Sequence, residues 1–220
     1  MNVLWNAVHA WKTDFKMMGP SAYVPFAISI AYLLLQFGFG LLGEWKLDMA
    51  TMLGEILLPL FAAWWPVYLL VPMLEGEGGD VLFGYPIHTF VLGSLRMCAY
   101  YVLYVANIAL AYALLHLASS LPMNMLFLQT TIQSFFFCSF GFFLMAVTRN
   151  SGISIVVLFA YALSFQIGKD LMPSFLNVYL NNAAPATAEQ LKSSILFPAL
   201  CSGIAMQILA NLRIDALRNG

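Results

Sequence analysis

The chain has 220 residues, of which 62% are hydrophobic and only 9% charged, and its formal net charge is −1. A soluble domain carries about a quarter charged residues, so this composition excludes an ordinary soluble protein and indicates a lipid bilayer as the solvent. Nucleic acid is not expected as a partner, because its binding requires clusters of Lys and Arg that this sequence lacks.

The first 20 residues predict an amphipathic helix that lies at the membrane interface. Their apolar side chains recur at three- and four-residue steps, and the charged side chains lie mostly on other faces. Gly19 and Pro20 are expected to end this helix. The next apolar run is longer than the core of a signal peptide, so we expect the N-terminus to be retained.

Six apolar stretches follow, separated by polar interruptions, and a helix needs roughly 20 such residues to cross a membrane. They cover residues 21–43, 52–74, 88–118, 124–147, 151–168 and 194–212, of which the fifth is the shortest. The predicted fold is therefore all-α. One polytopic membrane domain with six transmembrane helices occupies 21–212, and residues 213–220 form a short cytoplasmic tail.

The orientation follows from the basic residues, which are enriched on the cytoplasmic side of membrane proteins. With six spans both termini lie on one side, and more of the basic residues fall there than on the other. They are Lys12, Lys16, Arg96, Arg149, Arg213 and Arg218, against Lys46, Lys169 and Lys192. We therefore expect cytoplasmic termini and a location in the cell membrane, in a bacterium the plasma membrane.

The second predicted span contains three prolines, Pro59, Pro66 and Pro72. Each lacks a backbone N–H and leaves the carbonyl four residues earlier without its helical partner, so each can kink the helix. Such kinks serve as hinges in transporters and elsewhere only shape the packing, and the sequence is compatible with both.

Four polar residues inside the spans are candidates for a transport pathway or a helix contact. Glu55 is an acid about one turn inside the second span, where lipid exposure would be costly, although so shallow a position can also stay hydrated. Gln129 and Gln133 share one face of the fourth span, and Ser134 follows them. Polar side chains there either associate helices or line an aqueous path, and both interpretations stay open.

Motifs for catalysis and metal binding are absent from the sequence. It has no glycine-rich loop ending in Gly-Lys-Ser/Thr for ATP phosphates, no His-Glu-x-x-His metal pair and no Gly-x-Ser-x-Gly nucleophile turn. We therefore expect no catalytic residue, no metal site and no cofactor in this chain.

The connection between the second and third spans reads EGEGGDVLFGYPI over residues 75–87, which is far longer than a simple turn requires. It resembles the corresponding loop of the type-2 ABC transporter permeases, where Glu-x-Glu-x-Gly precedes an apolar pair and then Pro-Ile or Pro-Val. Asp80 departs from the pattern, because Thr is common there. The matching residues are Glu75, Glu77, Gly79, Leu82, Phe83, Pro86 and Ile87.

This resemblance implies that the loop is a cytoplasmic coupling helix docked on a separate ABC ATPase subunit, with acids facing basic groups and apolar side chains filling a pocket. It also implies a second permease chain, and ATP and magnesium bound by the ATPase partner. A solvated acidic loop is the rival interpretation. The predicted coupling residues are Glu75, Glu77, Asp80, Val81, Leu82, Phe83, Tyr85 and Pro86.

The leading hypothesis is therefore the membrane subunit of an ABC exporter. Importer permeases carry a Glu-Ala-Ala loop between later spans, where this chain has only TRNSG, which favours export. One alternative is the ligand-binding membrane subunit of a vitamin-type importer, which would need a high-affinity cavity. Another is an intramembrane enzyme, for which no reactive pair is found. The cargo is not specified by the sequence.

Overall fold

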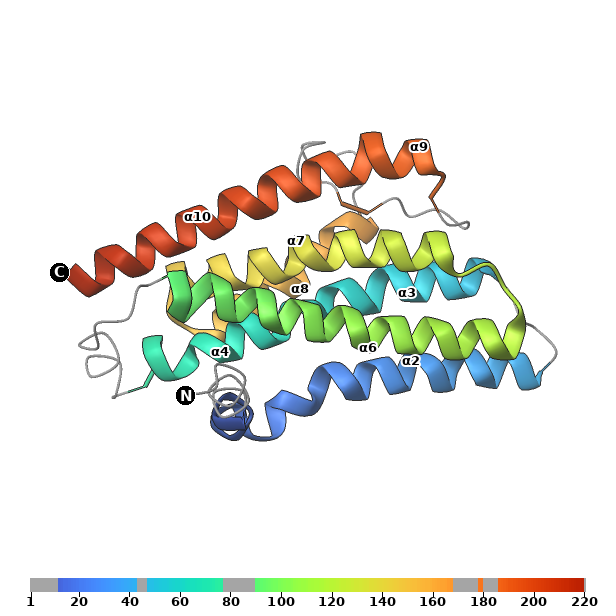
Figure 1. The fold of residues 1–220 in the computed structure, drawn as a ribbon, viewed down its shortest axis with the longest axis horizontal. Coiled ribbons are helices and arrows are strands. Elements are labelled where there is room, and N and C mark those ends of the chain that lie inside the picture. Colours follow the sequence, from blue (N-terminus) through green and yellow to red (C-terminus); the bar gives the residue numbers. More distant parts are fainter. Residues whose placement is uncertain (1–11, 43–46, 77–89, 168–177, 180–185, 220) are drawn as a thin grey trace, which may run out of the picture.

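The structure is a computed structural model that describes residues 12–42, 47–76, 90–167, 178–179 and 186–219. In these ranges all regular structure is helical, as predicted (Figure 1). Five helical stretches are long and apolar enough to cross a membrane: Lys12–Leu41, Leu47–Leu74, Gly93–Ser119, Asn124–Thr148 and Phe197–Arg218. The all-α membrane fold is confirmed at this level, whereas six spans stay a prediction.

The predicted interfacial helix is described from Lys12, and residues 12–18 are helical. A 3₁₀ turn, η1 (Gly19–Tyr23), follows and leads into α2 (Val24–Leu41). The turn is fixed from outside, since the indole N–H groups of Trp64 and Trp65 donate to the Ser21 and Ala22 carbonyls at 3.0 and 2.8 Å. The turn η1 is thus attached to the start of α4 (Trp64–Leu74).

An ion pair fastens the 12–18 helix to the third span. The Arg96 guanidinium binds the Asp14 carboxylate, with Nε donating to Oδ2 at 3.3 Å, and Asp14 is only 4% exposed. Next to it the Phe15 ring packs against the rings of Trp65 and Tyr100, with centroids 6.1 and 5.9 Å apart. Arg96, a charge within the third predicted span, therefore has a partner from the 12–18 helix.

The second predicted span is divided into α3 (Leu47–Ala62) and α4 (Trp64–Leu74). The break at Ala63 precedes Pro66, whose missing N–H leaves the Ala62 carbonyl without its helical donor. The Cys138 thiol from the fourth span takes that place, with Sγ 3.4 Å from the Ala62 oxygen. One of the predicted kinks is therefore stabilised by a neighbouring helix.

The third span begins with a π-helical turn, η2 (Val91–Leu95), and continues as α6 (Arg96–Ser119). The fourth is α7 (Asn124–Thr148), which packs against α3, α4, α6, α8 and α10. Figure 1 shows α7 between α2 and α10, which occupy opposite edges of the bundle. Because most of α7 is buried inside the protein, it is the element on which the polar groups of the other helices converge.

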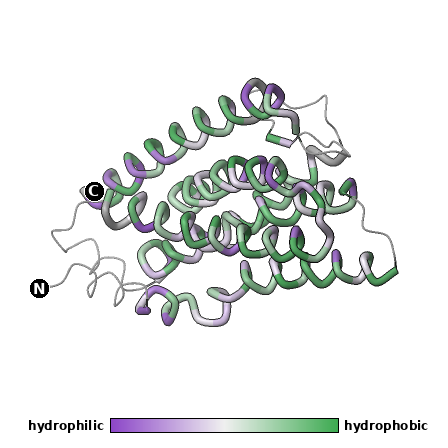
Figure 2. Tube along the Cα trace, turned by 45° about the vertical axis from the view of Figure 1, so that its right-hand side comes forward, coloured by the Kyte–Doolittle hydropathy of each residue, from purple (hydrophilic) through white to green (hydrophobic). Residues whose placement is uncertain are grey.

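The last elements are α8 (Ser151–Ile167), the short α9 (Ala188–Gln190), a π-helical turn η4 (Leu191–Leu196) and α10 (Phe197–Asn219). The 17-residue α8 is the predicted fifth span and is shorter than the five candidates. The predicted tail at 213–220 is helical as far as Asn219, as part of α10. In Figure 2 the outer helices are mainly hydrophobic, and hydrophilic residues gather toward helix ends.

Helix packing in a bilayer depends on close contact rather than on the hydrophobic effect, and Gly141 in α7 provides such a contact. A Cβ added there would lie 2.8 Å from the Ala63 Cβ and 2.9 Å from the Ala63 carbonyl oxygen. Gly141→Ala should therefore destabilise the protein, since overpacking costs about 1–3 kcal/mol and exceeds the roughly 0.5–1 kcal/mol that Ala gains over Gly in a helix.

Gly38→Ala in α2 is the matched control, because no atom lies within 4 Å of its added Cβ. Thermal unfolding of the purified proteins in detergent measures both changes. Gly141→Ala should lower the melting temperature, and Gly38→Ala should leave it unchanged or raise it. Equal effects of the two substitutions would contradict the close packing of α4 on α7.

Candidate functional site

The four polar residues predicted as candidates all lie in the interior, at the end of the bundle opposite the 12–18 helix. Glu55 is 2% exposed, Gln129 1%, and Gln133 and Ser134 are fully buried. Glu55 comes from α3 and the other three from the first turns of α7. A polar cluster at this depth is stable only if its members satisfy one another's hydrogen bonds.

Gln133 is the centre of this cluster, because its amide nitrogen uses both of its N–H groups. Nε2 donates to Oε1 of Glu55 at 2.9 Å and to the backbone carbonyl of Val178 at 2.7 Å. The first bond joins α7 to α3, and the second joins α7 to the connection that follows α8. One side chain therefore holds three separate parts of the chain together.

Gln129, one turn earlier on α7, holds the same connection at a second point. Its Oε1 accepts a hydrogen bond from the backbone N–H of Ala186 at 3.1 Å. Together with Gln133, it attaches both described ends of the segment between Val178 and Ala186 to α7. The bonds that the two glutamines make are thus structural, and a role in a transport pathway stays a prediction.

A group of hydroxyls extends the cluster beside Glu55, and the sequence interpretation missed it. The Thr130 hydroxyl donates to the Leu126 carbonyl at 2.8 Å, so the Tyr112 hydroxyl, 2.9 Å away, donates to Thr130. Gly54 leaves room for this contact, because an added Cβ would lie 2.7 Å from the Tyr112 oxygen. In the sequence, this group of hydroxyls is indicated by Gly54 beside Glu55 and by Thr130 beside Gln129.

Two acceptors in the cluster keep unused capacity. Among the described residues, neither Oε1 of Gln133 nor Oγ of Ser134 has a hydrogen-bond partner, although both atoms are buried. Buried polar atoms without a partner are uncommon in proteins and mark places that a water or a polar ligand can fill.

A second row of polar residues lies along α10, and it was not predicted from the sequence. Gln207 donates from Nε2 to the Ser139 hydroxyl of α7 at 3.0 Å, and Asn211 donates from Nδ2 to the Ser94 hydroxyl of η2 at 2.6 Å. Asp215 follows at the same four-residue step. This spacing of polar residues along one helical face was visible in the sequence of the last predicted span.

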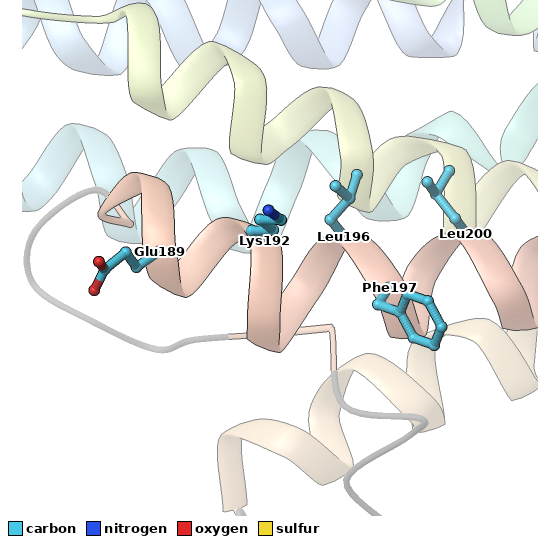
Figure 3. Close-up of a pocket in the computed structure, with 5 residues that line it drawn as sticks. All are labelled: Glu189, Lys192, Leu196, Phe197 and Leu200. Atoms are coloured by element: carbon cyan, nitrogen blue, oxygen red, sulfur yellow. The ribbon is translucent and has the colours of Figure 1, made fainter.

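In the described part of the chain, two cavities border the consecutive helical elements α9, η4 and α10. The larger, about 700 Å³, is lined by Glu189, Lys192, Leu196, Phe197 and Leu200 (Figure 3). In Figure 3 the side chains of Leu196 and Leu200 point to one side of the η4–α10 helix, and the Phe197 ring points to another side. The smaller cavity, about 390 Å³, is lined by Phe90, by Ser94 of η2 and by six residues of α10, among them Gln207, Asn211 and Asp215.

Of the predicted coupling residues, the structure describes Glu75, at the exposed end of α4. Its carboxylate accepts hydrogen bonds from the Ser151 backbone N–H and, at 3.1 Å, from the Ser151 hydroxyl. An acid at the first turn of α8 is favourable, because a helix N-terminus is electropositive. The rest of the predicted set lies outside the described residues: Glu77, Asp80, Val81, Leu82, Phe83, Tyr85 and Pro86.

No group of three or more His, Cys, Asp or Glu side chains that could hold a metal ion occurs in the part of the chain that the structure describes. Comparisons with protein-family models, with curated proteins and with solved structures gave no match. The resemblance of residues 75–87 to type-2 ABC permeases therefore stays a prediction from the sequence.

The cluster predicts that Gln133→Leu destabilises the protein. The substitution removes the donor from the Glu55 carboxylate and the Val178 carbonyl, and leaving a buried acceptor without a donor costs about 1–3 kcal/mol. Gln36→Leu is the control, because Gln36 is also buried in a span but its Nε2 has no partner among the described residues.

Chemical unfolding in detergent, followed by tryptophan fluorescence, compares the two variants with the parent. Gln133→Leu should unfold at lower denaturant concentration, and Gln36→Leu should be neutral or stabilising. Equal stability of the Gln133→Leu variant and the parent would show that the cluster does not hold these segments together.

Proposed function

We propose that this chain is the transmembrane permease subunit of a type-2 ABC exporter in the cell membrane. It works with a second permease chain and with separate cytoplasmic ATPase subunits that bind ATP and magnesium, and it contributes no catalytic residue itself. The observation that carries this proposal is the acid-rich segment 75–87, whose sequence resembles the coupling loop of that family and whose first residue, Glu75, binds Ser151 at the start of α8.

The attachments explain how a force on this loop would reach the membrane domain. On its upstream side Glu75 binds Ser151 at the start of α8, and on its downstream side Arg96 binds Asp14 of the interfacial helix. Mechanical coupling needs such contiguous contacts between rigid elements. A displacement of the loop by an ATPase would therefore move α8 and the 12–18 helix together with α4 and α6.

The proposal includes six crossings, with α8 as the fifth. At about 1.5 Å per residue, the 17 residues of α8 extend about 25 Å, slightly less than the roughly 30 Å hydrocarbon core. Since α8 starts next to the end of α7 and packs along it, it runs back across the bundle. The first helix 12–18, the α7–α8 turn and the end of α10 then share the cytoplasmic side with the loop.

The test of this proposal replaces the apolar pair of the loop, with Leu82→Ala and Phe83→Ala combined. If both side chains are buried interface anchors, each contributes roughly 2 kcal/mol or more to binding of the ATPase. The tagged parent chain, purified from native membranes, should carry a stoichiometric protein with ATP-binding motifs and ATP hydrolysis activity. The double variant should lose both by at least tenfold.

The control is Leu34→Ala with Leu35→Ala, an adjacent apolar pair that is exposed on α2. This variant should insert, purify and retain the ATPase like the parent. An ATPase that stays bound to the Leu82 and Phe83 variant would make the loop a solvated connection and remove the main support for the exporter proposal.

A further inference from the structure

Glu75, the first residue of the coupling segment 75–87, uses its side chain within this chain. One carboxylate oxygen, Oε1, accepts the Ser151 backbone N–H, and the other, Oε2, accepts the Ser151 hydroxyl at 3.1 Å. Hydrogen bonds to a charged group are stronger than those between neutral groups, and a donor on each oxygen fixes the orientation of the carboxylate. Both oxygens are thus directed at the start of α8.

The start of α8 has a cap of its own. Oδ1 of Asn150 accepts the Ile153 N–H at 2.9 Å, and the Asn150 carbonyl accepts the Ser154 N–H at 3.0 Å. These are the bonds of an Asn N-cap, which is among the most favourable residues at this position. Because the local cap is sufficient to begin the helix, what the Glu75 bonds add is a contact between α8 and α4.

On the other side of this contact, the backbone of Glu75 belongs to the end of α4. Its N–H donates to the Val71 carbonyl at 2.9 Å, as the C-cap of that helix. Farther along α8, Phe159 packs edge to face on Phe61 of α3, with ring centroids 6.0 Å apart. The Glu75–Ser151 bonds therefore hold α8 at its first residue, where the coupling segment begins, in addition to this apolar contact.

We propose that Glu75 is a positioning residue that holds the start of the coupling segment against α8, with Ser151 as its partner. This inference rests on the proposed function, and it changes the role of Glu75 within it. The resemblance to type-2 permeases implied that this acid faces a basic group of the ATPase. In the new role the ATPase contact falls to the other predicted coupling residues, and Glu75 passes the movement of the segment to α8.

The two roles differ in what the loss of the carboxylate does. If Glu75 contacts the ATPase, its removal weakens binding of the ATPase, and a change at Ser151 has no such effect. If Glu75 holds α8, removal of either partner loosens the contact between the helices and leaves the ATPase bound. Binding of the ATPase and movement of α8 are therefore measured separately.

Glu75→Ala and Ser151→Pro break the contact from opposite sides. Proline has neither the N–H nor the hydroxyl, so both donors are lost. It is well tolerated at the first position of a helix, and an N-cap residue normally has the extended backbone that also suits the residue before proline. The Asn150 cap is therefore kept. Ser151→Ala, which keeps the N–H, should have a smaller effect, and Asp48→Ala, at an exposed acid in the first turn of α3, is the control for lost charge.

Hydrogen–deuterium exchange of the purified full chain in detergent measures the contact without any partner. Each variant is compared with the parent on the helix that it leaves unchanged: the last turn of α4 for Ser151→Pro, and the first turn of α8 for Glu75→Ala. Exchange should be roughly fivefold faster or more in both, because a hydrogen bond to a charged group is lost, and Asp48→Ala should exchange like the parent. Exchange at the parent's rate in either helix would overturn the proposal.

Thiol labelling measures whether movement reaches α8. Ile153→Cys places a thiol at an exposed position in the first turn of α8, and labelling of the chain without this thiol is subtracted. In the complex with the ATPase, ATP with orthovanadate should change the labelling rate at position 153. Adding Glu75→Ala or Ser151→Pro should remove this change, and adding Asp48→Ala should not. A response that persists in both variants, or is absent from the parent, would overturn the positioning role.

Co-purification from native membranes separates this inference from the exporter proposal. Glu75→Ala and Ser151→Pro should both retain the ATPase at the parent's stoichiometry, unlike the Leu82 and Phe83 variant. Loss of the ATPase from Glu75→Ala alone would make Glu75 a partner contact and overturn its positioning role. If the parent carries no ATPase, the exporter proposal fails, and the exchange measurement still decides whether Glu75 holds α8.

Discussion

A polar group inside a bilayer must find its hydrogen bonds within the protein, because lipid offers none. This constraint explains the central position of α7. Gln129, Thr130, Gln133 and Ser139 follow one another along it and bind groups of α3, α6, α10 and the connection after α8. Close packing and interhelical hydrogen bonds together hold helices in lipid, so these bonds, with close contacts such as Gly141 on Ala63, fix the register of the bundle.

The two ends of the bundle are held in different ways. At one end Gln133 and Gln129 bind the backbone of Val178 and of Ala186, in the connection after α8. At the other end, charged side chains join separate helices: Glu75 to α8, and Arg96 to the 12–18 helix. Side-chain contacts between rigid elements at that end can pass a movement of the loop to several helices at once.

The sequence predicted the helical fold and the apolar stretches long enough to cross a membrane, because the length of such a run reflects the thickness of the membrane. It did not fix every end of these stretches: two of them begin at Leu47 and Gly93, whereas 52 and 88 were predicted. It also indicated Glu55 and the α7 glutamines, since polar residues inside a span are conspicuous. It could not indicate their partners. The Asp14–Arg96 pair, the Cys138 bond to the Ala62 carbonyl and the Asn211–Ser94 bond join residues distant in the chain, and local pattern carries no information on such pairs.

The proposed exporter requires a bundle that spans the membrane with the 12–18 helix and residues 75–87 on the cytoplasmic side. Ser120 and Arg149 test it as a matched pair, because each is an exposed, left-handed C-cap and they lie at opposite ends, after α6 and after α7. Single Ser120→Cys and Arg149→Cys variants are treated in intact cells with an impermeant thiol reagent, and labelling of the unsubstituted chain is subtracted. We predict that position 120 is labelled at once and position 149 only after permeabilisation. Labelling of position 149 in intact cells would contradict this orientation and the exporter mechanism built on it.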